Sequence, residues 1–360
     1  MRTTKTFSLV LNIIFLFILT FIISGCTRNE VTDTTEYIEA SPLTDYFDPS
    51  LPEGTIEFTN LILDIDAFNR IIPLGQINPP GHTFPTDHIY FVLSKYSQPV
   101  YAPVSGKVLF IDEPGDYGDR AIRIGVTKTM SYYLGHILIS DGLEVGDMVV
   151  SGEQIGVTGN TSCVDFGVLN LNIVNQFLNT NYPRTTIYGD KPLSFYTEPL
   201  KTQLYSLVLP HEALDTTYTY DGGVTDGTFV YDINGTLSGN WFRESYLDEN
   251  DWYEWADTLS FCYDVYYTDQ IRIAIGTWYN AFAINNDDSP LKPEEANTAS
   301  GIITYYLYNA NNTTYGLPTD TQPMAVMLVQ MISDTRIKVE IFDFANASGD
   351  FSSAATFYVR

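Results

Sequence analysis

The sequence predicts an all-β protein that consists of two β-rich domains. Short apolar runs, separated by glycine and proline, recur about every 8 to 12 residues between residues 55 and 180 and again after residue 225. β-Branched and aromatic side chains dominate these runs, as half-buried pleated surfaces favour, and the second region has no convincing helical periodicity. We therefore expect an antiparallel β-sheet domain followed by a second domain that is a β-barrel or a sandwich.

The apolar runs define the strands that we expect in each domain. In the first domain they cover residues 90–93, 106–111, 121–126, 148–150 and 155–157. In the second domain they cover residues 228–233, 259–267, 271–275, 302–307, 325–331, 337–342 and 355–359. Each run has the length of a single strand, and the glycine and proline residues between the runs are typical of turns.

The N-terminus is typical of an exported lipoprotein. Basic residues without an acid precede an apolar run over residues 7–23, and the small residues Ser24 and Gly25 then precede Cys26. This order predicts a signal peptide over residues 1–25 and lipid on the thiol of Cys26. Acyl chains gain about 0.8 kcal/mol per buried methylene group, so we expect membrane anchoring in the cell envelope. The alternative, an uncleaved membrane-spanning anchor, also places the domains outside the cytoplasm.

Changes in composition divide the mature chain into four segments. Residues 26–53 are rich in Thr, Asp, Glu, Ser and Pro, a composition that predicts a disordered tether. Residues 54–195 form the expected first domain, residues 196–225 the expected linker, and residues 226–360 the expected β-rich C-terminal domain. Two domains are expected because the mature chain is longer than one hydrophobic core normally covers.

Charge and cysteine content exclude two classes of protein. The net charge is −26, from 44 acidic and 18 basic residues, and the basic residues form no cluster that would contact nucleic-acid phosphates. The acidic residues are spread along the chain, which is typical of a solvated surface. Apart from Cys26, only Cys163 and Cys262 remain, and they fall in different expected domains. The sequence therefore predicts no disulfide framework.

Three blocks in the first domain form a recognisable motif. Residues 98–108 predict a strand, a turn and a return strand, and residues 132–137 read Tyr-Tyr-Leu-Gly-His-Ile. Residues 143–161 contain four spaced glycines, at positions 146, 152, 156 and 159. In order and spacing, these blocks resemble the β-sheet domain of the M23 (lysostaphin/LytM-type) zinc peptidases. The resemblance covers about a third of the chain, roughly residues 75 to 170.

The resemblance implies a zinc site, from which this sequence departs. The family holds zinc through the His and Asp of an HxxxD motif and the second His of an HxH motif, and uses two further histidines around a metal-bound water. Carried over residue by residue, His88 is the first ligand, Asp165 the last, and His136 the accessory catalytic histidine. Val92 stands where the ligand Asp is expected, and Cys163 and Asp165 replace the two imidazoles of HxH.

One zinc ligand therefore remains unassigned. His82 or Asp87, in the loop before His88, would complete a His/His/Asp set, which is acceptable to zinc. In the alternative interpretation, His82 and His88 are ordinary loop residues, Asp165 is solvated or caps a turn, and His136 makes a structural hydrogen bond. We favour this second interpretation because loss of two imidazoles that activate water would cost several decades of rate.

Three functions follow from these observations. The leading hypothesis is an envelope-anchored lipoprotein whose M23-like domain binds peptidoglycan or a partner protein without hydrolysis. The first alternative is an active zinc endopeptidase of peptidoglycan with a variant His/Asp metal site. In the second alternative, the M23-like domain is structural and the C-terminal domain carries ligand binding. Tryptophans 241, 252, 255 and 278 all lie in that domain, where they serve as core residues or as a sugar-stacking surface.

Overall fold

The computed structural model describes residues 43–360 except for residues 80, 116, 180–181, 215–219, 221–224, 245–256, 312, 315 and 348. The expected signal peptide, the lipidation site at Cys26 and the first part of the expected tether lie outside the described residues. In the described part, no helix is both long enough and apolar enough to cross a membrane.

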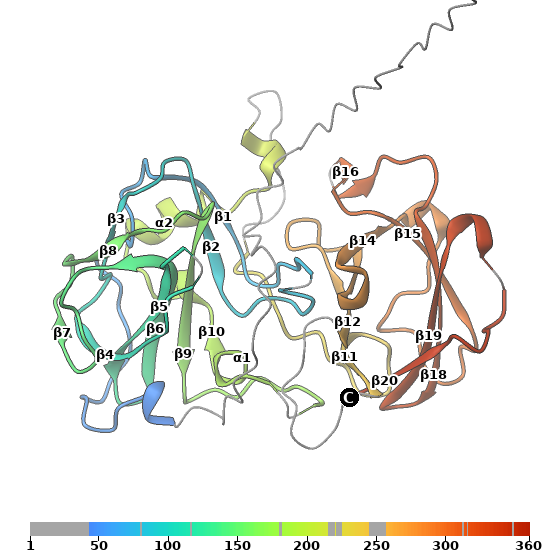
Figure 1. Ribbon diagram of the computed structural model, residues 1–360, viewed down its shortest axis with the longest axis horizontal. Helices are drawn as coiled ribbons and strands as arrows, with labels where there is room; N and C mark the ends of the chain where they lie inside the picture. The colour runs from blue at the N-terminus through green and yellow to red at the C-terminus, as the bar shows by residue number, and fades with distance from the viewer. Residues whose placement is uncertain are drawn as a thin grey trace, which may run out of the picture.

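The first domain is an antiparallel sheet of ten strands (Figure 1). Its main path runs in the order β1-β2-β9-β6-β5-β4-β7, while β10 pairs with β9 and β8 pairs with both β3 and β6. The strands are β1 (Phe68–Ile72), β2 (Ile89–Leu93), β3 (Pro99–Tyr101), β4 (Gly106–Ile111), β5 (Arg120–Thr127), β6 (Met130–Ile139), β7 (Met148–Val149), β8 (Gln154–Thr158), β9 (Cys163–Asn170) and β10 (Gly189–Asp190).

Alternation along β2 explains how this sheet is covered on both faces. Ile89 and Phe91 point into the main core of the first domain, whereas Tyr90 and Val92 join a smaller buried cluster on the opposite face. Successive side chains of a strand point to opposite faces, so a strand that is apolar throughout requires cover on both. The second face of β2 is covered in part by Val265, which belongs to the other domain.

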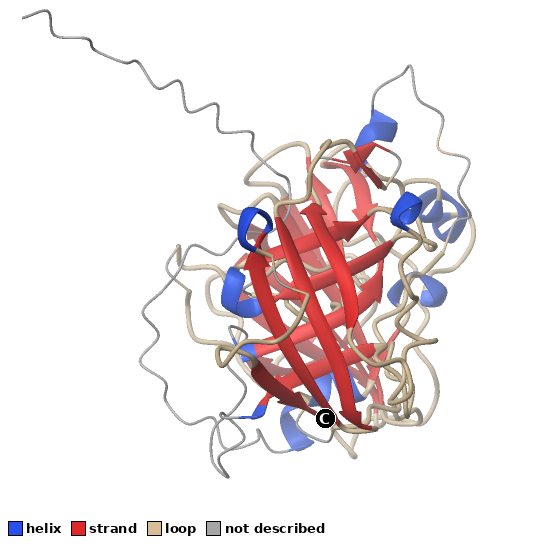
Figure 2. Cartoon of the chain, turned by 90° about the vertical axis from the view of Figure 1, so that its right-hand side faces the viewer, coloured by secondary structure: helices blue, strands red, loops and turns tan. Residues whose placement is uncertain are grey.

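The second domain is a closed antiparallel barrel, which settles the choice between barrel and sandwich. Eight strands follow one another around it, and the last strand, β20, pairs with the first, β11. Figure 2 views the molecule from the side of this domain. The barrel strands are β11 (Gly239–Arg243), β12 (Thr258–Tyr263), β13 (Ile271–Ile275), β14 (Asn280–Ile284), β15 (Ile303–Asn309), β18 (Ala325–Ser333), β19 (Arg336–Asp343) and β20 (Thr356–Val359); β16 (Thr313–Thr314) and β17 (Leu317–Pro318) form a separate hairpin.

Large side chains fill the barrel, and Arg360 lies where its first and last strands meet. Trp241, Phe261, Phe282 and Tyr305 are all fully buried in one core. The guanidinium of Arg360 lies 4.0 Å from the centre of the Trp241 ring and donates to three backbone carbonyls. A buried cation over an indole ring is a favourable contact, so this pair joins the two ends of the barrel sheet.

Short helices complete both domains. In the first domain and the connection that follows it they are η1 (Leu43–Asp45), α1 (Arg184–Ile187), η2 (Pro192–Phe195), α2 (Leu200–Tyr205) and η3 (His211–Leu214). In the barrel they are η6 (Gly276–Trp278), η7 (Asn286–Asp288) and η8 (Phe344–Asn346). The described end of the expected tether packs on the sheet, since Phe47 is buried and Arg123 stacks on Tyr46.

Two expectations about strands were wrong. The strands around the predicted turn at residues 105–106 both exist, but β3 pairs with β8 and β4 pairs with β5 and β7, so they do not form a hairpin. Residues 228–233 are not a strand. Phe229 instead packs into the core of the first domain, and Gly227 forms a bridge with Leu74, because this segment connects the domains and contacts both.

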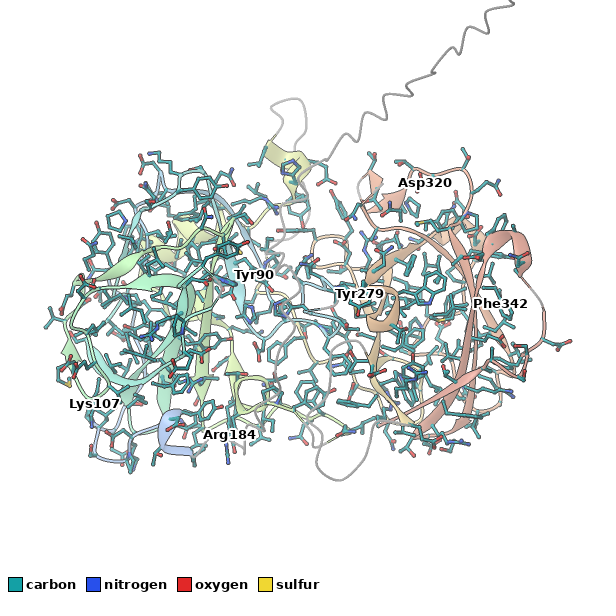
Figure 3. All side chains as sticks on the ribbon, viewed as in Figure 1. Tyr90, Lys107, Arg184, Tyr279, Asp320 and Phe342 are labelled. Carbon is teal, nitrogen blue, oxygen red and sulfur yellow. The ribbon has the colours of Figure 1, made fainter. Side chains whose placement is uncertain are left out.

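The domains pack directly against each other through two apolar clusters. In one cluster, Val265 and Tyr266 from the β12–β13 connection contact Ile72, Tyr90 and residues near them. The second cluster joins the aromatic rings of Phe84, Tyr182 and Phe242. Figure 3 shows Tyr90, a member of the first cluster, on the side of the first domain that faces the barrel.

Candidate functional site

Asp165 lies at the centre of the polar site on the first sheet. It is on β9, opposite Tyr90 of β2 and Gly135 of β6. A Cβ atom on residue 135 would lie 3.2 Å from Oδ2 of Asp165 and 3.1 Å from its Cβ, so glycine leaves the room that the carboxylate needs. The resemblance assigned Asp165 to the last ligand position, and the structure places it between two histidines.

His136 reaches this site because β6 bulges at that residue. β6 pairs with β9 up to Gly135 and with β8 from Ile137 onwards, and its register with β5 shifts across the same residues. The φ angle of His136 is +63°, a left-handed conformation that few residues other than glycine adopt. Bulges of this kind re-aim side chains next to functional sites. Here the imidazole Nδ1 lies 2.7 Å from Oδ2 of Asp119.

His88 enters the same site from the opposite side. It is the last residue before β2, and its Nδ1 lies 2.9 Å from Oδ1 of Asp87. Asp87 also accepts hydrogen bonds from the hydroxyls of Tyr133 and Thr186, at 3.0 and 2.6 Å. Burial by itself would raise the pKa of Asp87, but these hydrogen bonds outweigh it and lower the pKa to about 2. Gly167 leaves room for the Tyr133 ring.

The Nε2 atoms of both histidines face Asp165. His88 Nε2 lies 3.6 Å and His136 Nε2 lies 3.5 Å from Oδ2 of Asp165, longer than hydrogen bonds. Both Nδ1 atoms carry protons because their partners are carboxylates, so neutral imidazoles would direct Nε2 lone pairs at Asp165. Among the described residues, the buried Nε2 atom of His88 has no hydrogen-bond partner. Burial opposes charge on His88, but the Asp165 and Asp87 carboxylates outweigh it and raise its pKa.

His82 and Asp87, the two candidates for the remaining ligand, occupy different places. The His82 ring lies 5.4 Å from the His88 ring between centroids, on the same side of the sheet as Tyr90. Burial lowers the pKa of His82 to about 4, so this imidazole is neutral at pH 7. Asp87 instead binds the Nδ1 side of His88, away from Asp165.

The donor types and spacings of this site suit zinc in part. Two ligands of a tetrahedral zinc ion, each bound at about 2.0–2.1 Å, lie about 3.3–3.4 Å apart, close to the 3.5 and 3.6 Å observed around Asp165. Two atoms that accept hydrogen bonds from one ammonium group, each about 2.8 Å from its nitrogen, would lie about 4.6 Å apart. The observed spacings are therefore closer to those around zinc than to those around an ammonium group. Among the described residues, however, no three His, Cys, Asp or Glu side chains form a complete metal-binding group as they stand.

Several polar residues of the site were not predicted from the sequence. Asp119 precedes β5, Tyr133 lies on β6 and Thr186 lies in α1, and each fixes a histidine or the carboxylate behind it. None of them is at a fixed spacing from the histidines. Of these residues, the motif contained only Tyr133, in the tyrosine pair before His136. The resemblance used that pair to align the motif and assigned it no function.

Comparison with known families agrees with the fold of the first domain. A model of Peptidase family M23 matches residues 89–180, which include His136 and Asp165 and begin immediately after His88. No curated protein matches the chain.

Similar solved structures include Csd3 of Helicobacter pylori, at 16% identity over 49% of this chain and 48% of that one, with a TM-score of 0.29. The catalytic domain of lysostaphin from Staphylococcus simulans is 21% identical over 35% of this chain and 87% of that one, with a TM-score of 0.25. LytU is 23% identical over 37% of this chain and 87% of that one, with a TM-score of 0.27. This chain spans about half the length of Csd3.

Proposed function

We propose, from the M23 peptidase-like domain that this chain carries, that the domain binds peptidoglycan or an envelope protein without hydrolysing it. In this proposal, lipid on Cys26 anchors the chain to a membrane in the cell envelope, outside the cytoplasm. Detergent phase separation tests the anchor. The wild-type protein enters the detergent phase, and a Cys26→Ala chain stays in the aqueous phase.

The number of imidazoles in the site supports binding without hydrolysis. The resemblance implies that a zinc peptidase of this type needs histidines both as ligands and as proton carriers around the water. In the described part of the chain, the site offers only His82, His88 and His136. If the two histidines that face Asp165 serve as ligands, His82 alone remains. Burial lowers the pKa of His82 to about 4, which makes it a weak base at pH 7.

The binding role would depend on Asp165. Its carboxylate is about 14% exposed and lies between two imidazoles that carboxylates hold by Nδ1. An N–H group of a peptide would donate to this carboxylate, and hydrogen bonds to charged groups contribute about 1.5–3 kcal/mol. Peptides of the cell wall and extended segments of envelope proteins both present such donors.

A sedimentation and cleavage assay on purified peptidoglycan tests this function. We expect the mature protein to sediment with peptidoglycan and to release no soluble fragments. Asp165→Asn is expected to weaken binding about tenfold or more. The exposed turn residue Asp141 gives a matched control, and Asp141→Asn is expected to bind as the wild type does. Release of fragments that disappears in a His136→Ala protein would show hydrolysis and refute the proposal.

The second candidate, a zinc endopeptidase with a variant ligand set, is favoured by the spacing around Asp165 and by the buried Nε2 atom of His88. His88, His136 and Asp165 would hold the ion. Asp87 and Asp119 would orient the two imidazoles, as carboxylates behind metal-binding histidines do. Zinc, when bound, polarises a carbonyl and lowers the pKa of bound water to about 7.

Metal content separates the two candidates. The mature, tag-free protein is purified without chelators and its metal is measured by plasma mass spectrometry, beside a His88→Ala, Asp165→Ala protein. About one zinc ion per chain in the wild type alone, together with peptidoglycan cleavage, would establish the variant peptidase. Zinc without cleavage fits a binding domain that holds a metal. A zinc-free wild-type protein excludes the zinc peptidase.

A further inference from the structure

We propose that Phe242, on the first strand of the barrel, is a positioning residue for the loop that carries His82 and His88. The two domains would then share one site, although every histidine of that site belongs to the first domain. This inference is independent of the proposed function because it concerns the geometry of the imidazoles and not their ligand.

The loop between β1 and β2 has its own backbone framework. Gly75 N donates to Thr86 O at 2.9 Å, and Thr86 N donates to Gln76 O at 3.0 Å. Nearer the tip, Asn78 and His82 exchange two backbone hydrogen bonds, at 2.7 and 3.0 Å. These hydrogen bonds pair the two arms of the loop as in a narrow hairpin. We therefore expect a displacement of Phe84 to move the histidines on the same arm.

An aromatic contact with the barrel holds the outer side of this hairpin. Phe84 is 4% exposed, and its ring lies 5.1 Å from that of Phe242 and 5.7 Å from that of Tyr182, between centroids. The rings of Tyr182 and Phe242 are 5.8 Å apart, which completes the cluster. Edge-to-face pairs at such distances are favourable beyond their buried area. Phe84 is separated from His82 by one residue and from His88 by three.

Phe242 does not serve the barrel's own core. Its neighbour Trp241 points into the barrel and is fully buried there, whereas Phe242 belongs to the cluster with Phe84 and Tyr182. Successive residues of a strand point to opposite faces, so Phe242 projects outward from the barrel. At 3% exposure it is nevertheless buried. Its large side chain therefore packs against the loop, and we expect its truncation to leave the barrel interior intact.

The contact reaches the polar site through a short chain of residues. After Phe84, Pro85 restricts the backbone, and the Thr86 hydroxyl donates to the carbonyl of His88 at 3.3 Å. Asp87 is held by Tyr133 and Thr186 on the other side. His88 is thus fixed between the barrel contact and the sheet, and relaxation at Phe84 would shift its Nε2 relative to Asp165.

Hydrogen exchange and imidazole nitrogen NMR on the full chain test the inference. In Phe242→Ala we expect the amides of His82 and Thr86 to exchange about tenfold faster or more, because local opening loses its apolar restraint. The ¹⁵N shifts of His82 and His88 should change, while those of His211 should not. Phe242→Leu, which retains apolar bulk, is expected to restore most of the protection.

A matched truncation elsewhere on the barrel controls for general destabilisation. Phe351 packs under the ammonium of Lys338 and is not part of the contact with the loop. Phe351→Ala should leave the loop amides and both imidazole signals unchanged. Wild-type exchange and shifts in folded Phe242→Ala would overturn the inference, as would an equal effect of Phe351→Ala. If Phe242→Ala does not fold, Phe242→Val replaces it, because valine suits a strand but lacks the ring that contacts Phe84. Wild-type exchange and shifts in Phe242→Val would then overturn the inference.

Discussion

At the scale of single residues, the backbone of His136 departs most clearly from ordinary strand geometry. A left-handed conformation costs a residue with a Cβ atom about 1–2 kcal/mol relative to its right-handed alternative. His136 adopts it within a ten-residue strand, where β6 changes its partner from β9 to β8. Strain of this kind persists where the surrounding structure enforces it, and it concentrates at functional sites. The strain directs the imidazole toward Asp165.

Two substitutions of His136 separate this strain from the loss of the side chain. Both His136→Ala and His136→Gly remove the imidazole and its hydrogen bond to Asp119. Only glycine adopts a positive φ angle without steric cost, so we expect His136→Gly to be about 1 kcal/mol more stable than His136→Ala. Urea denaturation followed by circular dichroism measures the difference. Equal stabilities, or a less stable glycine variant, would contradict a strained backbone at this position.

The sequence named several titratable residues of the candidate site but not their arrangement. The resemblance assigned His88, His136 and Asp165, and His82 was one of two candidates for the unassigned ligand; these four residues lie near one another in the structure. The sequence could not place Asp119, because its contact with His136 depends on a bulge that changes the register of β6. A bulge is a property of strand pairing between distant segments, and no local pattern specifies it.

At the scale of elements, the apolar pattern found several strands of the first domain but missed β6 and β9, which carry His136 and Asp165. It gave β2 and β4 to within one residue, whereas no apolar run was assigned to β6 or β9. The reason is physical. β6 carries Gly135 and His136, and β9 carries Asp165 and Gly167, so polar and small residues interrupt the apolar run where the site lies. Such conflicts between local pattern and fold are expected at functional sites.

At the scale of the whole molecule, residues of the barrel domain pack directly against the sheet of the first domain. Tyr266 donates a hydrogen bond to the carbonyl of Ile71 on β1 at 3.2 Å, and its ring packs against the cluster with Ile72 and Tyr90. Gly227 and Leu74 approach so closely that a Cβ at residue 227 would lie 2.0 Å from the carbonyl oxygen of Leu74. This contact could not be predicted from the sequence, because it joins segments that are far apart along the chain.

The contacts of Tyr266 predict that the two domains unfold together. The fluorescence of Trp241, which is fully buried in the barrel, reports that domain, while hydrogen exchange of β6 and β9 reports the first domain. We expect both probes to follow a single transition in the wild type. Tyr266→Ala removes an interdomain hydrogen bond and apolar contacts worth about 2–4 kcal/mol, so the transitions should separate. Tyr306, 40% exposed on β15, gives the matched control, and Tyr306→Ala should keep one transition. Coincident transitions in Tyr266→Ala would show that the interface does not couple the domains.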